Sequence, residues 1–138
     1  MLESPPSLLI TDDDGAFRET LCSVFAPRGY RTWTARDGDE ALAILHQQPI
    51  HVLLTDLHMP RLNGLETIRR IRQRRLILPC ILLSAGLDGA IIQQARDLET
   101  FSVLPKPVRF SEVTHAVRQA LRETYGWSGS EEARPDPA

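Results

Sequence analysis

The chain has 138 residues, of which 42% are hydrophobic, and a formal net charge of -2. This length and composition predict a single soluble globular domain with a full core, and the near-balanced charge gives no bulk attraction to nucleic acid or to a membrane surface. No apolar run approaches the roughly 18 residues that span a bilayer, and residues 1–7 lack the features of a signal peptide. The two cysteines, Cys22 and Cys80, are in no metal-binding spacing. They predict reduced thiols in a cytoplasmic protein.

Five short apolar runs alternate with five stretches of helical periodicity. Strands are predicted at residues 7–11, 30–35, 52–55, 80–83 and 102–104. A helix is predicted after each strand, with apolar faces that include Phe17 and Leu21, then Ala41 and Leu42, then Leu65 and Ile68, then Ile91, Ile92 and Ala95, and finally Val113 and Val117. Because strand and helix alternate, a parallel sheet with helices on both faces is expected.

The predicted domain covers residues 7–124. Residues 1–6 are expected to be a loose lead-in. Residues 125–138 are rich in Gly, Ser, Pro and charge, so a flexible tail or a truncated linker is expected there.

Polar side chains follow four of the five predicted strands. Asp12 and Asp13 follow the first strand, Asp56 the third, Ser84 the fourth and Lys106 the fifth. The carboxyl ends of parallel strands share one edge of a sheet, where ligands bind in open α/β folds. These side chains are therefore predicted to meet in one shallow site. Lys106 is also the only lysine among the 16 basic residues, a hint that arginine would not serve there.

The residue types at these positions suit phosphoryl transfer. Three carboxylates in one site repel, by roughly 4 kcal/mol for two charges about 4 Å apart at an effective dielectric near 20. A Mg²⁺ ion between Asp13 and Asp56 would offset the repulsion, because hard oxygen ligands suit this ion. The compact ammonium of Lys106 suits an oxygen of Asp56 or of a phosphate on it, and the Ser84 hydroxyl can donate to another phosphate oxygen. The predicted reaction is phosphoryl transfer to a carboxylate nucleophile.

Four segments carry a family resemblance: LLITDDD, TDLHMPRLNGLE, ILLSAG and VLPKP, in this order. With them, the chain resembles the receiver domain of bacterial two-component response regulators over about residues 7–124. The resemblance implies a flavodoxin-like (βα)5 fold, with five parallel strands in the order 2-1-3-4-5 and a switch point between the first and third strands. It also implies a phosphorylation-switched signalling module rather than an enzyme.

Carried over by position, the resemblance makes Asp56 the phospho-acceptor, Ser84 the switch hydroxyl and Lys106 the lysine of the site. It also implies a cis peptide bond between Lys106 and Pro107. The implied ligands of Mg²⁺ are Asp13, Asp56, the main-chain carbonyl of His58 and, through water, Asp12.

The implied phosphodonor is a sensor histidine kinase, a phosphotransfer protein or a small phosphodonor. The implied readout is binding of an unidentified output partner by the surface of the last two helices and the fifth strand. A phosphorylation-dependent homodimer is compatible with the resemblance, whereas direct contact of this chain with nucleic acid or a membrane is not expected.

The chain departs from the family pattern at several positions. Val103 stands where many receivers have Tyr or Phe, so the familiar aromatic rotamer switch cannot operate in its usual form. Pro105 lacks an N–H group, which an edge strand tolerates. Glu99 and Thr100 replace a common small turn, so an atypical exit from the fourth helix is expected. His58 is an unusual side chain beside the site.

Two other functions stay open. An aspartyl-phosphate phosphatase would need a carboxylate two residues after its nucleophile, where this chain has His58. A pseudo-receiver that binds a partner without phosphorylation would not need the full set of site residues.

Two further charged features have structural explanations. Asp14 is expected to cap the helix that follows it. The arginines between residues 69 and 75 are expected to form a solvated helix face, because no aromatic residues interleave with them as in nucleic-acid binding patches.

Overall fold

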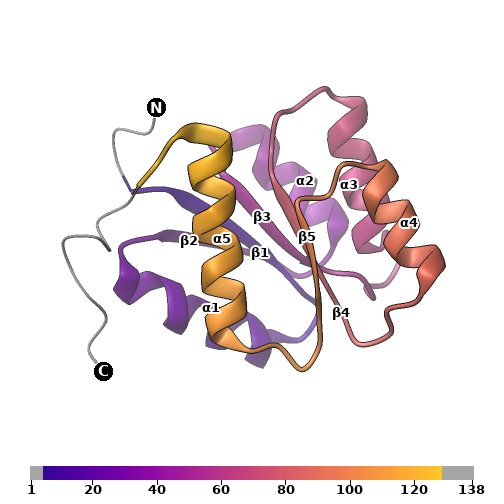
Figure 1. The fold of residues 1–138 in the computed structure, drawn as a ribbon, viewed down its shortest axis with the longest axis horizontal. Coiled ribbons are helices and arrows are strands. Elements are labelled where there is room, and N and C mark those ends of the chain that lie inside the picture. Colours follow the sequence, from indigo (N-terminus) through magenta and orange to yellow (C-terminus); the bar gives the residue numbers. More distant parts are fainter. Residues whose placement is uncertain (1–4, 129–138) are drawn as a thin grey trace.

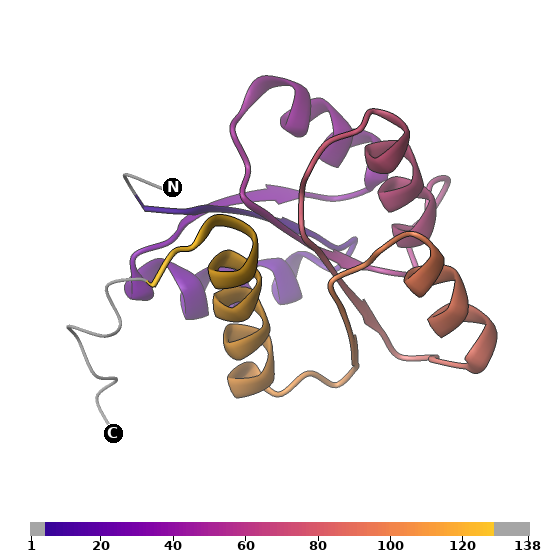
Figure 2. The same cartoon turned by 45° about the horizontal axis from the view of Figure 1, so that its top comes forward.

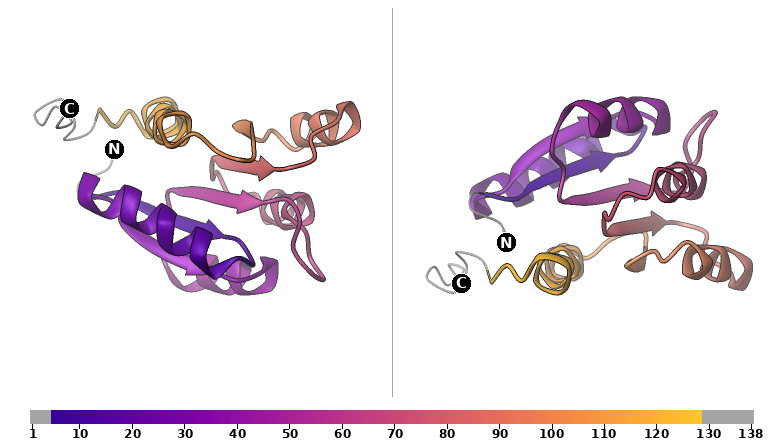
Figure 3. Two further views of the ribbon diagram at one scale, coloured as in Figure 1. Left: turned by 90° about the horizontal axis from the view of Figure 1, so that it is seen from below. Right: turned by 90° about the horizontal axis from the view of Figure 1, so that it is seen from above.

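Five parallel strands form one sheet in the computed structural model, which describes residues 5–128. The strand order is β2-β1-β3-β4-β5, as predicted, and every neighbouring pair is parallel; the arrows of β3 and β4 show this direction in Figure 3. This is the flavodoxin-like order, with its switch point between β1 and β3. The strands are β1 (Ser7–Thr11), β2 (Arg31–Ala35), β3 (Val52–Asp56), β4 (Cys80–Ser84) and β5 (Ser102–Pro105).

Helices cover both faces of this sheet. Helices α1 and α5 lie on one face, and α2, α3 and α4 lie on the other (Figures 1 and 2). The helices are α1 (Gly15–Phe25), the short 3-10 helix η1 (Ala26–Arg28), α2 (Gly38–Gln47), α3 (Gly64–Gln73), α4 (Gly89–Asp97) and α5 (Phe110–Tyr125).

The core consists of two apolar layers, one on each face of the sheet. Every residue of β1, β3 and β4 is buried, since helices cover both sides of these strands. Leu54 packs with Val117 of α5 in one layer, and the residue before it in β3, Leu53, packs with Ile68 of α3 in the other. Each fully buried side chain of this size contributes about 1.5–3 kcal/mol to stability.

Local signals in the sequence set several element boundaries. The Asp14 carboxylate accepts hydrogen bonds from the main-chain N–H groups of Ala16 and Phe17 at 3.0 and 3.3 Å, so the predicted cap of α1 is confirmed. Asn63 and Glu66 form a reciprocal capping box at the start of α3. Pro105 lies on the edge strand β5, where a missing N–H group is tolerated.

Two elements differ from the prediction. Helix α1 continues into η1, which ends at Gly29 with a φ of 93°, a left-handed conformation that glycine adopts without strain. The predicted buried face of α4 is only partly correct. Ala95 is the only residue of α4 that is fully buried, and Ile92 is 39% exposed.

The last residue of α5 and the residues that follow it contact the rest of the domain. The Tyr125 hydroxyl donates to the main-chain carbonyl of His51 at 2.8 Å. The Trp127 ring lies 5.8 Å from the Tyr30 ring, measured between centroids. Residues 129–138, the rest of the predicted tail, lie outside the described residues.

Both cysteines are free thiols, as predicted; Cys22 is half-buried and Cys80 is buried. Within residues 5–128, no helix is both long and apolar enough to cross a membrane.

Candidate functional site

Three carboxylates from two strand ends meet at the carboxyl edge of the sheet. Oxygen atoms of Asp12, Asp13 and Asp56 all lie within 4.8 Å of one another. Lys106, which follows β5, reaches this cluster with its Nζ atom, 2.7 Å from Asp12 Oδ2 and 3.2 Å from Asp56 Oδ1. The structure thus brings together four of the predicted site residues, and the ammonium of Lys106 contacts two of the three carboxylates.

Asp12 is a fixed part of the site. Its residue is 1% exposed, and its second carboxylate oxygen, Oδ1, accepts the main-chain N–H of Asp14 at 2.9 Å. Its main-chain carbonyl accepts a hydrogen bond from Arg18 Nη1 at 2.6 Å. Asp13, in contrast, is exposed to solvent, and no hydrogen-bond partner of its carboxylate is seen within residues 5–128. Asp13 is therefore the carboxylate that is open to an incoming ligand.

Asp56 is the last residue of β3 and is 5% exposed. Helix α3 begins directly against it. The main-chain N–H of Gly64 donates to the carbonyl of Leu57 at 2.9 Å, and a β-carbon at Gly64 would overlap the main-chain oxygen of Asp56. A glycine at this position therefore lets the start of α3 approach the main chain of Asp56 closely.

The environment of the carboxylates makes the site electrostatically unbalanced. Burial, followed by the charge of Asp12, raises the pKa of Asp56, and the charges of Lys106 and His58 only partly oppose this rise. Burial acts to lower the pKa of Lys106, but its contacts with Asp12 and Asp56 more than offset burial, so the pKa is raised overall. The ammonium is therefore charged at neutral pH.

The donor set fits a hard divalent cation. Carboxylate oxygens are preferred ligands of Mg²⁺, which usually binds through one or two carboxylates and retains several waters. The cluster of Asp12, Asp13 and Asp56 could hold such an ion, and Asp13 supplies the solvent-facing ligand. The geometry thus supports the predicted acidic metal pocket.

Ser84 lies at the end of β4 and is fully buried. Its hydroxyl accepts the main-chain N–H of Gly86 at 3.1 Å and lies 3.5 Å from Nε2 of the exposed His58 side chain. Its carbonyl accepts the N–H of Lys106 at 2.9 Å, which joins the ends of β4 and β5. Within residues 5–128, no hydrogen bond joins the Ser84 hydroxyl to the three aspartates.

Two features of Lys106 concern its immediate surroundings. The Lys106–Pro107 peptide bond is cis, as predicted. The Nζ atom also lies 4.3 Å from the centre of the Phe17 ring. The sequence assigned Phe17 only to the core. Helical periodicity is the same whether an apolar side chain packs in the core or also contacts a charged group such as the Lys106 ammonium.

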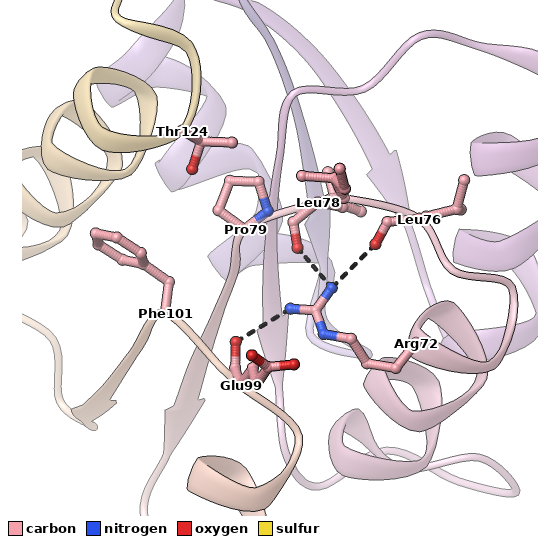
Figure 4. A pocket seen from close by; sticks show the side chains of 8 residues that line it. Arg72, Leu76, Leu78, Pro79, Glu99, Phe101 and Thr124 are labelled. Atoms are coloured by element: carbon pink, nitrogen blue, oxygen red, sulfur yellow. Dashed lines mark hydrogen bonds between the residues drawn. The ribbon is translucent and has the colours of Figure 1, made fainter.

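A second concavity of about 300 Å³ lies at the opposite edge of the sheet, where β4 and β5 begin (Figure 4). Its main polar group is Arg72, whose guanidinium donates to the main-chain carbonyls of Leu78, Leu98 and Glu99 at 2.9, 2.8 and 3.2 Å. The prediction of a solvated arginine face is therefore wrong for Arg72, which ties together the loops before β4 and β5. Its neighbours Arg69, Arg70, Arg74 and Arg75 are exposed, as predicted.

The exit from α4 is atypical, as expected from its sequence. Glu99 has a φ of 56°, a left-handed conformation that is uncommon for residues other than glycine. The hydrogen bond from Arg72 to the Glu99 carbonyl holds this turn in place. Val103 is half-buried and packs on the same core layer as Ile91.

Comparison with known proteins yields one family. The family model of the response regulator receiver domain matches residues 8–118. Response regulator RR06 of Streptococcus pneumoniae is 32% identical over 119 residues, which are 86% of this chain and 54% of RR06. The DNA-binding transcriptional regulator NtrC of Salmonella typhimurium is 34% identical over 112 residues, 81% of this chain and 24% of NtrC.

The fold comparison agrees. The crystal structure of a response regulator receiver protein from Pseudomonas putida superposes with a TM-score of 0.81 and 31% identity, covering 86% of this chain and 99% of that chain. The chain therefore matches the whole of that receiver, but spans only about half of RR06 and about a quarter of NtrC.

Proposed function

The chain belongs to the response regulator receiver domain family, and we propose on this basis that it is a phosphorylation-switched signalling domain whose phospho-acceptor is Asp56. The observation that carries the proposal is the position of this carboxylate. Asp56 ends the central strand β3, lies within 4.8 Å of two other carboxylates, and has the ammonium of Lys106 at 3.2 Å. One nucleophile, a metal pocket and a cation thus share one edge of the sheet.

In the proposed reaction, a carboxylate oxygen of Asp56 attacks the phosphorus of a phosphohistidine on a histidine kinase or phosphotransfer protein. The new O–P bond forms as the P–N bond to the donor imidazole breaks, which leaves an acyl phosphate on Asp56 and a free imidazole on the donor. Lys106 pairs with the oxygens of the transferred group. Asp13 and Asp56, with the main-chain carbonyl of His58 and with Asp12 through water, would hold Mg²⁺, which would neutralise phosphoryl charge when bound.

The acyl phosphate carries about -1.5 to -2 charges, where the Asp56 carboxylate carried one, so phosphorylation makes this buried position more negative. We propose that Lys106 and the Ser84 hydroxyl respond to this charge, and that the response reaches the surface of α4, β5 and α5. Two observations support this route. Ser84 ends β4 just before α4, and Ala95 is the only residue of α4 that is fully buried, while Ile91 packs only partly buried against the core.

Partners and location follow from the same proposal. A histidine kinase or phosphotransfer protein would dock at the open edge of the sheet in the cytoplasm, and the switched surface would bind an output partner or a second copy. In NtrC, whose name states DNA binding, most of the length lies outside the matched region. Any such output of a longer chain would therefore reside outside residues 7–124, the proposed receiver unit.

Two rival functions are less well supported. An aspartyl-phosphate phosphatase lacks its second carboxylate here, because His58 occupies that position. A pseudo-receiver, which binds its partner without phosphorylation, would not require the pairing of Lys106 with both Asp12 and Asp56.

The test is Mg²⁺-dependent labelling by acetyl phosphate, read by intact mass. Asp56→Asn is expected to abolish the added phosphoryl mass. The matched control is Asp14→Asn, which removes one nearby carboxylate but keeps a side chain that caps α1 equally well. Labelling that persists in Asp56→Asn at the wild-type level would remove the basis for the acceptor assignment.

A further inference from the structure

The ammonium of Lys106 is held by three groups from three different elements. Asp12 follows β1, Asp56 ends β3, and Phe17 belongs to the first turns of α1; their contacts with Nζ are 2.7 Å, 3.2 Å and 4.3 Å, the last to the ring centre. We propose that Phe17 is a positioning residue, whose ring keeps the Lys106 ammonium beside Asp56 before and after phosphoryl transfer. The catalytic part of this inference rests on the proposed acceptor role of Asp56.

The ring of Phe17 is itself well fixed. Its main-chain N–H donates to the Asp14 cap at 3.3 Å, and its half-buried side chain packs against the core layer that contains Leu21. Lys106, in contrast, carries its charge on a flexible four-carbon stem. The face of an aromatic ring attracts an ammonium at this distance. A rigid ring therefore gives the ammonium a third fixed contact, besides the two carboxylates, and so narrows the positions that the flexible stem can adopt.

An aromatic ring differs from a further carboxylate in its charge. It attracts the ammonium without a formal negative charge, so it adds no repulsion toward an incoming phosphoryl group. When Asp56 carries that group, one of the two carboxylate partners of Lys106 has changed. The contacts with Asp12 and Phe17 do not involve Asp56, so they can persist and keep the ammonium next to the phosphoryl oxygens.

The kinetic arm of the test compares two substitutions at one position. Phe17→Leu keeps an apolar side chain but removes the ring face, and it is expected to slow acetyl phosphate labelling of Asp56 by about 2- to 30-fold. Phe17→Tyr keeps the ring and is expected to stay within about 2-fold of wild type. The Mg²⁺ concentration that gives half the maximal rate should be unchanged in both, because Phe17 is not among the metal-binding groups.

The control for lost packing is Val24→Ala. Val24 packs on the same core layer as Phe17 but lies about two helical turns further along α1. This variant is expected to lose stability and to label at the wild-type rate.

The spectroscopic arm does not depend on phosphorylation. Because Lys106 is the only lysine, protein made with ¹³C-lysine gives a single ε-methylene signal. In metal-free wild type, the Phe17 ring current should shift these protons upfield of a free lysine. Phe17→Tyr should retain the shift, whereas Phe17→Leu and a urea-unfolded sample should lose it.

The outcomes separate the two proposals. A normal labelling rate in Phe17→Leu, or equally slow labelling in the leucine and tyrosine variants, would overturn the positioning role, as would the absence of a ring-current shift. If wild type itself is not labelled, the proposed function fails, while the ring-current shift still shows whether Phe17 holds the ammonium.

Discussion

Lys106 lies closer to Asp12 than to Asp56. Its Nζ atom is 2.7 Å from Asp12 Oδ2 and 3.2 Å from Asp56 Oδ1, although the sequence led us to expect Asp56 as its partner. Asp12 is almost completely buried, and both of its carboxylate oxygens have hydrogen-bond donors. Asp12 thus anchors the ammonium, and the charge of Asp56 is only partly compensated. This imbalance agrees with the raised pKa of Asp56.

Removal of the Lys106 charge should destabilise the domain. Lys106→Met leaves Asp12 and Asp56 facing each other without a cation, so the free energy of unfolding in urea should fall by about 1–3 kcal/mol. Mg²⁺ should recover part of this loss, and its stabilising effect should be larger in the variant than in wild type. Arg70→Met, the same charge change at an exposed residue of α3, should stay within about 0.5 kcal/mol. Equal losses in both variants would contradict the assignment of Lys106 as the balancing cation.

Asp56→Asn should make the metal-free protein more stable at neutral pH. The pKa of Asp56 is raised in the fold, so its stabilising contribution is present at low pH and is lost as pH rises through the folded pKa. The neutral amide of asparagine removes the cost of burying a charge beside Asp12. The free energy of unfolding in urea at pH 7 is therefore expected to rise by about 0.5–2 kcal/mol. The gain should shrink as pH falls toward the pKa of Asp56. A destabilised variant at pH 7 would argue against the unbalanced charge described above.

Gly64→Ala should disturb the site without changing any charged group. Its β-carbon would overlap the main-chain oxygen of Asp56 and crowd Leu82, so a loss of about 1–3 kcal/mol and slower acetyl phosphate labelling are expected. Gly89→Ala is the matched control, because a β-carbon there meets nothing within 4 Å at the start of α4. The control should keep or slightly raise stability. Similar effects of both substitutions would show that the contact beneath Asp56 is unimportant.

His51 should give the fold a mild sensitivity to acid. Its Nδ1 atom accepts the main-chain N–H of Ser7 at 2.9 Å, and burial lowers its pKa from 6.5. A lowered pKa means that the stabilising contribution is complete above the unfolded value and is lost as pH falls through the folded one. Urea unfolding from pH 8 to 5 should therefore show falling stability below about pH 6.5.

The matched variant for this pH effect is His51→Asn. Its side-chain oxygen can accept the same N–H, and it does not titrate in this range. Both proteins should carry Asp56→Asn, since Asp56 would otherwise act in the opposite direction as pH falls. The variant also loses the edge-to-face contact of His51 with Tyr125. The comparison therefore uses the slope of the unfolding free energy against pH, not the unfolding free energy itself. Equal slopes in the two proteins would exclude His51 as the source of the acid sensitivity.

The parts of this molecule that follow from one stretch of sequence were predictable. Residues Asp12, Asp56 and Lys106 each follow a short apolar run, and the parallel arrangement of such runs puts their ends on one edge. The cap at Asp14 depends only on its own helix. The four motif strings added the strand order and the cis peptide bond.

The parts that depend on side-chain direction were not predictable. Helical periodicity assigns Phe17 to an apolar face but does not show that its ring contacts the ammonium of Lys106, the residue after β5. Arg72 follows exposed arginines in the sequence, yet its guanidinium turns toward loop carbonyls 26 and 27 residues away. Ile92 is apolar and was expected on the buried side of α4, but no neighbouring element covers it fully.

The two thiols of the domain should differ sharply in chemical reactivity. Burial raises the pKa of Cys80 to about 12, and the nearby Arg72 guanidinium opposes this rise only in part. The reactive thiolate of Cys80 is therefore almost absent at neutral pH. Cys22 is half-buried on α1, the helix that carries Phe17. A maleimide dye would accordingly attach at Cys22 alone, which makes the native chain a singly labelled reporter for the α1 side of the site without any substitution.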